Sequence, residues 1–127
     1  MDDLTLEGTA KTPEVNFRAD KGTLELLGKS IPENSLEFYK PIYDWIDAYS
    51  RQPAKTTEVK IQLEYFNTSS SKCLLDIFRK LEALNKSAAS TVNVTWMYEE
   101  EDEDMMEAGD DYKTLVNMNF SIEKISS

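Results

Sequence analysis

The sequence predicts a single α/β domain, with a mixed and mostly parallel β-sheet that carries helices on one face. Stretches in which every second residue is apolar alternate with stretches of helical period, in the order β-β-α-β-α-β-α-β. Strands separated by helices are joined most simply by right-handed parallel crossovers. The later strands alternate apolar and polar residues, whereas a sheet covered on both faces has nearly continuous apolar strands. We therefore expect the other face of the sheet to be polar.

Length and charge limit the organisation and the partners of the chain. With 127 residues, of which 40% are hydrophobic, it can bury one substantial core, so residues 1–127 are expected to form one domain. The net charge of −10 disfavours binding to nucleic acid or to anionic lipid. The amino terminus lacks the pattern of a signal peptide and no apolar run approaches the length of a membrane span, which predicts a cytoplasmic protein.

A β-hairpin is expected between residues 12 and 30. Two short alternating runs have their apolar positions at Val15, Phe17, Leu24 and Leu26. Gly22 lies between the two runs, and a glycine supplies the permissive backbone that a tight hairpin needs.

A first helix is predicted after the hairpin. Its apolar stripe consists of Phe38, Ile42, Trp45, Ile46 and Tyr49. Asn34 is the predicted N-cap, and Glu37 follows three residues later, as is typical of a helix start. Pro41 lacks a backbone N–H group, so it should kink the helix or delay its regular part to about Tyr39.

The next strand runs straight into a second helix. The predicted apolar side of the strand is formed by Val59, Ile61, Leu63 and Tyr65. The predicted apolar stripe of the helix is formed by Leu74, Ile77, Phe78 and Leu81. Between them, the segment 67–71 offers side-chain oxygens to the unpaired N–H groups of the first helical turn, which predicts a helix cap.

This run of small polar residues has two interpretations. It can serve only to end the strand and begin the helix. It can also be a phosphorylation switch, because a phosphate there would meet free N–H groups and the positive end of the helix dipole, worth ~0.3–1 kcal/mol at an exposed terminus. Phosphorylation adds about −1.5 to −2 charge and can change a docking surface without unfolding a domain. The local chemistry leaves both interpretations open.

The remaining residues predict a strand, a helix and a last strand. The apolar positions of the two strands are Val92, Val94, Trp96 and Tyr98, and then Val116, Met118, Phe120 and Ile122. The acidic run 99–104 precedes a helix through Met105 and Met106, and it is interpreted as a solvated helix N-terminus. A calcium site is the alternative, but the run lacks the alternating acidic positions, central glycine and distant glutamate of an EF-hand loop. No metal site is predicted.

The composition also argues against an enzyme. The chain has no histidine, which removes the commonest general base and every serine–histidine arrangement. Its four glycines are scattered, so it has neither a P-loop nor a dinucleotide-binding fingerprint. The single cysteine, Cys73, excludes an internal disulfide and a cysteine-based zinc site, and it is expected to be an inert packing residue. We therefore expect a non-enzymatic protein without a cofactor.

Several motifs, in order along the chain, resemble those of the SiaC family of bacterial regulatory phosphoproteins. The fold of this family is similar to that of the STAS anti-sigma-factor antagonists, so the resemblance implies a STAS-like domain. The resemblance runs nearly end to end. The motifs are Gly8-Thr9 with Thr12-Pro13, Pro32-Glu33-Asn34-Ser35, Tyr65-Phe66-Asn67-Thr68-Ser69-Ser70, Trp96-Met97-Tyr98-Glu99, and Asp102-Glu103-Asp104-Met105-Met106-Glu107-Ala108-Gly109.

The resemblance implies that Thr68 is the phosphoacceptor. The candidate residues around it, at the docking surface for a partner, are Asn67, Ser69, Ser70 and Lys72. The implied partners are a serine/threonine kinase of the histidine-kinase-like ATPase type, a metal-dependent phosphatase and a diguanylate cyclase. In its unphosphorylated form, the best-known relative binds and activates the cyclase, which raises cyclic di-GMP and promotes biofilm formation. We expect the free chain to be a monomer.

Two other functions are compatible with the same residues. The domain could act in partner switching upstream of a sigma factor, with the kinase as its principal partner, or it could be a small-ligand sensor that uses the apolar side of the sheet.

Two features of the sequence depart from the family pattern. Pro41 interrupts the first helix, and it affects which partner can bind if that helix forms part of the docking surface. Ser71 lengthens the run of hydroxyl residues, so that Ser69, Ser70 or Ser71 could also accept phosphate.

Overall fold

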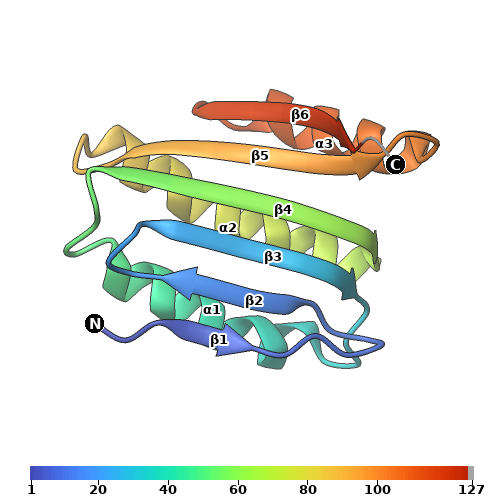
Figure 1. Cartoon of the computed structure of the whole chain (residues 1–127), viewed down its shortest axis with the longest axis horizontal. Coiled ribbons are helices and arrows are strands. Elements are labelled where there is room, and N and C mark those ends of the chain that lie inside the picture. Colours follow the sequence, from blue (N-terminus) through green and yellow to red (C-terminus); the bar gives the residue numbers. More distant parts are fainter. Residues whose placement is uncertain (126–127) are drawn as a thin grey trace.

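A computed structural model describes residues 1–125 and shows one sheet with helices packed on a single face (Figure 1). The strands are β1 (Leu4–Leu6), β2 (Glu14–Arg18), β3 (Thr23–Ser30), β4 (Thr56–Phe66), β5 (Thr91–Glu99) and β6 (Asn119–Ile125). The helices are α1 (Ser35–Tyr49), α2 (Thr68–Lys86) and α3 (Glu103–Leu115). The described residues contain no helix that is long and apolar enough to cross a membrane.

The strands lie in the sheet in the order in which they occur in the chain, β1-β2-β3-β4-β5-β6. The first three pair antiparallel, and β3 to β6 pair parallel. The predicted order of strands and helices is thus confirmed, with one addition. The short strand β1 precedes the hairpin and pairs Leu4 with Phe17 and Leu6 with Val15. A strand of three residues carries too little alternation to be recognised in the sequence.

The hairpin between β2 and β3 requires the predicted glycine. Gly22 has a φ of +67°, in the left-handed region that favours glycine. A Cβ atom at this position would also lie 2.5 Å from the carbonyl oxygen of Thr56, at the start of β4. The glycine therefore serves both the turn and the close approach of the next strand.

Helix α1 begins at Ser35, directly after its predicted N-cap. The amide of Glu37 donates to the side chain of Asn34 at 3.1 Å. The helix then continues through Pro41 to Tyr49, so the prediction of a delayed start near Tyr39 is wrong. A proline removes one intrahelical hydrogen bond, and here the cap and the buried stripe of the helix outweigh that loss.

The end of β4 departs from the predicted alternation. In the pairing with β3, Gly28 lies opposite Leu63 but Lys29 lies opposite Tyr65, so Glu64 is an extra residue that forms a β-bulge. The bulge inverts the alternation of inward and outward side chains. Tyr65, predicted to face the core, is therefore 57% exposed, and Phe66 packs against the core instead.

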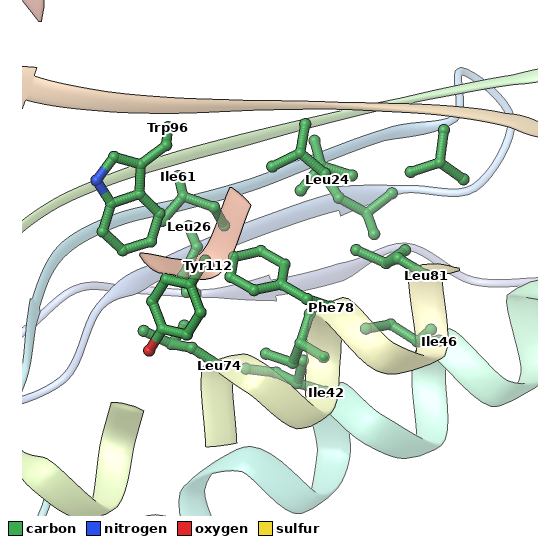
Figure 2. Close-up of a cluster of buried hydrophobic side chains, with 14 of the residues drawn as sticks. Leu24, Leu26, Ile42, Ile46, Ile61, Leu74, Phe78, Leu81, Trp96 and Tyr112 are labelled. Atoms are coloured by element: carbon green, nitrogen blue, oxygen red, sulfur yellow. The ribbon is translucent and has the colours of Figure 1, made fainter. Parts of the chain in front are cut away.

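The core lies between the sheet and the helices, and Figure 2 shows a cluster of its buried hydrophobic side chains. Trp96, from β5, is fully buried and lies against Phe78 of α2 and Tyr112 of α3. The indole N–H of Trp96 donates to the carbonyl oxygen of Met105 at 2.9 Å. Gly109 lets α3 approach this ring, since a Cβ there would lie 2.5 Å from Trp96 Cδ1. Trp96 thus fixes α3 onto the sheet.

Candidate functional site

The candidate site lies where β4 ends and α2 begins, at the carboxyl edge of the parallel strands. Asn67 links the two elements and holds the first turn of α2. Its backbone N–H donates to the carbonyl oxygen of Ser30 at the end of β3, and its side-chain oxygen accepts from the amide of Ser70 at 2.9 Å. Asn67 is therefore the N-cap of α2, which confirms the predicted cap.

Ser70 belongs to a buried hydroxyl network. Ser30 Oγ donates to Ser70 Oγ at 2.8 Å, and Ser70 Oγ donates to the carbonyl oxygen of Ser30 at 3.0 Å. Because the hydroxyl proton of Ser30 is used in the bond to Ser70, the bond between Ser30 Oγ and the hydroxyl of Tyr39, 2.6 Å away, must have Tyr39 as its donor. Burial raises the pKa of Tyr39 to about 12, which keeps this donor protonated. The network anchors α2 to β3 and α1.

The neighbouring serines are also engaged in hydrogen bonds. Ser69 Oγ lies 2.6 Å from Ser35 Oγ, at the start of α1, and donates to the side chain of Asn67 at 3.2 Å. Ser71 Oγ donates to the carbonyl oxygen of Thr68 at 2.9 Å. In contrast, the side chain of Thr68 is exposed, and within residues 1–125 its hydroxyl has no hydrogen-bond partner. Among the described residues, Thr68 is thus the member of the run whose hydroxyl is exposed and not engaged in a hydrogen bond.

The surroundings of Thr68 suit an anion. Thr68 is the first residue of α2, where the helix dipole is positive and the first N–H groups have no intrahelical acceptor. Lys72 lies one turn further on, is exposed, and forms no ion pair within the described residues. No acidic residue occupies the first turn of the helix. A phosphate on Thr68 would thus meet N–H groups and one lysine.

Part of this arrangement could not be predicted from the sequence. Ser35 contacts Ser69 across 34 positions, and Ser30 contacts Ser70 across 40. These partners are small polar residues at the ends of other elements, which is also what ordinary turns contain. Gly28 was the one local signal for the bulge before the site, because an isolated glycine in a strand often marks one.

The acidic run 99–104 follows β5, the strand next to β4, and lies at the same carboxyl edge of the sheet. Asp102 is the N-cap of α3, and its side chain accepts from the amide of Met105 at 3.0 Å. Glu103 and Asp104 lie in the first turn, where the helix dipole favours negative charge. In the part of the chain that the structure describes, no group of three or more acidic, cysteine or histidine side chains could hold a metal ion.

Fold and site together define a small α/β domain with an exposed, anion-compatible helix N-terminus. The chain matches the SiaC family of regulatory phosphoproteins over residues 6–125, and it belongs to that family. An uncharacterized protein of Pseudomonas aeruginosa (strain UCBPP-PA14) is 30% identical over 123 residues, which cover 97% of each chain.

Solved structures support the same assignment. SiaC of Pseudomonas aeruginosa superposes with a TM-score of 0.88 at 29% identity, covering 98% of this chain and all of that one. A crystal structure of the diguanylate cyclase SiaD in complex with its activator SiaC, from the same organism, matches with a TM-score of 0.91 at 29% identity, covering 97% of this chain and 100% of the matched one. The α/β fold predicted from the sequence is confirmed by these structures.

Proposed function

We propose that the chain is a non-enzymatic regulator that binds and activates a diguanylate cyclase in its unphosphorylated form. The support for this partner is the relative from Pseudomonas aeruginosa, whose complex with the cyclase that it activates has been solved. The observation that carries the proposed switch is that Thr68 lies at a helix N-terminus with an exposed hydroxyl that has no hydrogen-bond partner among residues 1–125. The protein would act in the cytoplasm as a monomer, without a cofactor.

We further propose that a serine/threonine kinase phosphorylates Thr68 and that a metal-dependent phosphatase reverses the reaction. Phosphorylation would act by local charge and shape. The anchors of the first turn of α2, from Asn67 and Ser70, do not involve the hydroxyl of Thr68, so modification leaves them in place. The domain is therefore expected to remain folded while its surface changes.

The proposed activation of a diguanylate cyclase can be tested by measuring the activity of that enzyme. We expect the purified chain to raise cyclic di-GMP synthesis by the cognate cyclase, with a response that saturates as the chain is added, because activation requires a complex. The measurement is the rate of cyclic di-GMP formation by chromatography at fixed cyclase concentration. A heat-denatured sample of the same chain is the negative control. A cyclase whose rate does not respond to the folded chain would contradict the proposed function.

The identity of the phosphorylated residue can be tested by mass spectrometry. Thr68→Ala is expected to abolish most phosphate incorporation by the kinase while the fold persists, because the cap of α2 comes from Asn67 and not from Thr68. Ser69→Ala and Ser71→Ala are matched controls in the same turn and should still be phosphorylated. Intact-mass analysis after kinase treatment measures the phosphate incorporated by each of the three variants. Undiminished incorporation in Thr68→Ala, with the modified peptide mapped to Ser69 or Ser71, would show that another hydroxyl is the acceptor.

A further inference from the structure

The first turns of α1 and α2 lie side by side because of the topology of the sheet. Strands β3 and β4 are parallel neighbours, and their last residues, Ser30 and Phe66, are paired in register. Each strand leads into a helix, so α1 and α2 begin at the same edge of the sheet (Figure 1). There the first residue of α1, Ser35, contacts Ser69 of α2, with 2.6 Å between their Oγ atoms. A residue of one helix thus holds a hydroxyl at the start of the other.

The hydroxyl of Ser69 belongs to an exposed residue, yet its oxygen and its proton are both engaged. Its proton is donated to the side-chain oxygen of Asn67 at 3.2 Å, so Ser35 must be the donor in the shorter bond to Ser69 Oγ. Ser35 is buried, and within residues 1–125 its hydroxyl has Ser69 as its one hydrogen-bond partner. Breaking this bond would leave a buried hydroxyl without a partner, which is costly.

Phosphorylation requires a hydroxyl that is free to turn. In transfer from a nucleoside triphosphate, a bond forms between the hydroxyl oxygen and the γ-phosphorus, and the bond from this phosphorus to the leaving nucleoside diphosphate breaks. The hydroxyl proton passes to a base of the kinase. The attacking oxygen must therefore direct a lone pair at the phosphorus and its proton at the base. Ser69 can do so only after it has left Ser35 and Asn67.

The other hydroxyls of the run are held in different ways. Ser70 is fully buried, and Ser71 donates to the carbonyl oxygen of Thr68 within its own helix. Thr68 is exposed, and its hydroxyl has no partner among residues 1–125. Ser69 differs from all three, because it is exposed and its hydroxyl is held by a residue of another helix.

We propose that Ser35 is a specificity-determining residue of the phosphorylation, because it holds the hydroxyl of Ser69 and so confines the kinase to Thr68. This inference rests on the proposed phosphorylation of Thr68. It adds a residue of α1 that selects between two adjacent hydroxyls of α2. Ser35 is a positioning residue, since it acts through Ser69.

Site-resolved phosphorylation tests this selection in chains that lack the proposed acceptor. Thr68→Ala/Ser35→Ala is expected to incorporate phosphate on Ser69 at least about threefold faster than Thr68→Ala, because one neutral hydrogen bond corresponds to a factor of about three to ten in rate. The measurement is the initial rate at each residue, from mass spectrometry of phosphopeptides after treatment with the purified kinase. Adding Ser69→Ala to the double variant should remove the gain.

Two matched variants separate a released hydroxyl from a loosened helix. Thr68→Ala/Ser30→Ala also removes a hydroxyl bonded to the first turn of α2, but the partner that it releases, Ser70, is fully buried. It should therefore gain phosphate at neither Ser69 nor Ser70. Thr68→Ala/Ser35→Thr keeps a hydroxyl at position 35 and should retain the low rate at Ser69.

Circular dichroism establishes that each of these variants is folded. An equal gain at Ser69 in the variant that lacks the hydroxyl of Ser30, or in the one with threonine at position 35, would overturn the assignment to Ser35. It would show that any change at the start of α1 or α2 exposes Ser69 to the kinase.

The experiment also separates this inference from the proposed function. If Thr68→Ala incorporates phosphate as fast as the unmodified chain, the proposed acceptor is wrong, and the selection by Ser35 is wrong with it. If Thr68→Ala loses most phosphate but the further loss of Ser35 leaves the rate at Ser69 unchanged, Thr68 remains the acceptor and Ser35 does not select it.

Discussion

Phosphorylation of Thr68 is expected to weaken binding of the chain to its cyclase roughly tens- to thousands-fold, without unfolding the domain. A partner packed around Asn67 and Lys72 would have to desolvate a dianion, and an unpaired charge at an interface typically costs ~2–5 kcal/mol. Thr68→Asp should reproduce only part of the effect, because it carries one charge and lacks the tetrahedral oxygens.

The measurement is calorimetric binding of the unmodified, phosphorylated and Thr68→Asp chains, beside circular dichroism of all three. Thr91→Asp is the matched control, because Thr91 is exposed but lies at the start of β5, at the other end of the parallel strands. Its affinity should equal that of the unmodified chain. Equal affinities for the phosphorylated and unmodified chains would eliminate the switch, and a lost dichroism signal would mean that phosphorylation unfolds the domain.

Trp96→Ala is expected to lower the free energy of unfolding by ~3–5 kcal/mol, a large share of the ~5–15 kcal/mol that stabilises a typical domain. The substitution removes a fully buried ring whose centroid lies 5.3 Å from that of Tyr112 and 6.4 Å from that of Phe78. It also leaves the carbonyl oxygen of Met105 without its donor.

Urea unfolding followed by circular dichroism measures this loss. Trp96→Phe is the graded comparison, since it keeps an aromatic ring in the cluster but loses the indole N–H. Its loss of stability should be clearly smaller than that of Trp96→Ala. A Trp96→Ala variant as stable as the unmodified chain would show that the contact between α3 and the sheet does not depend on this ring.

The sequence was sufficient to predict those helices and strands that have a long and regular pattern of apolar residues. The stripe of Leu74, Ile77 and Phe78 and the cap at Asn67 predicted α2, because helical period and capping chemistry are local properties. The end of β4 was predicted wrongly. The bulge at Glu64 is a property of its pairing with β3, and a single extra residue there turns Tyr65 away from the core.

The site was predicted from the sequence only in part. The hydroxyl run and the resemblance pointed to Thr68, but local chemistry did not distinguish it from the three serines that follow. The structure separates two of these serines from Thr68, because Ser70 is fully buried against Ser30 and Ser69 contacts Ser35. These differences arise from tertiary contacts over more than thirty positions, which no local pattern contains.

The strand order of the sheet has a consequence for synthesis of the protein. Because each strand pairs with its predecessor in the chain, the sheet can grow at one edge as the polypeptide leaves the ribosome. Helix α2 is complete at Lys86, whereas α3 begins only at Glu103 and β6 ends at Ile125. A nascent or truncated chain that stops before α3 would present Thr68 on α2 without the neighbouring helix, whose Tyr112 donates to the carbonyl oxygen of Ser71. The surface around Thr68 is therefore complete only after α3, which ends at Leu115, has been synthesised.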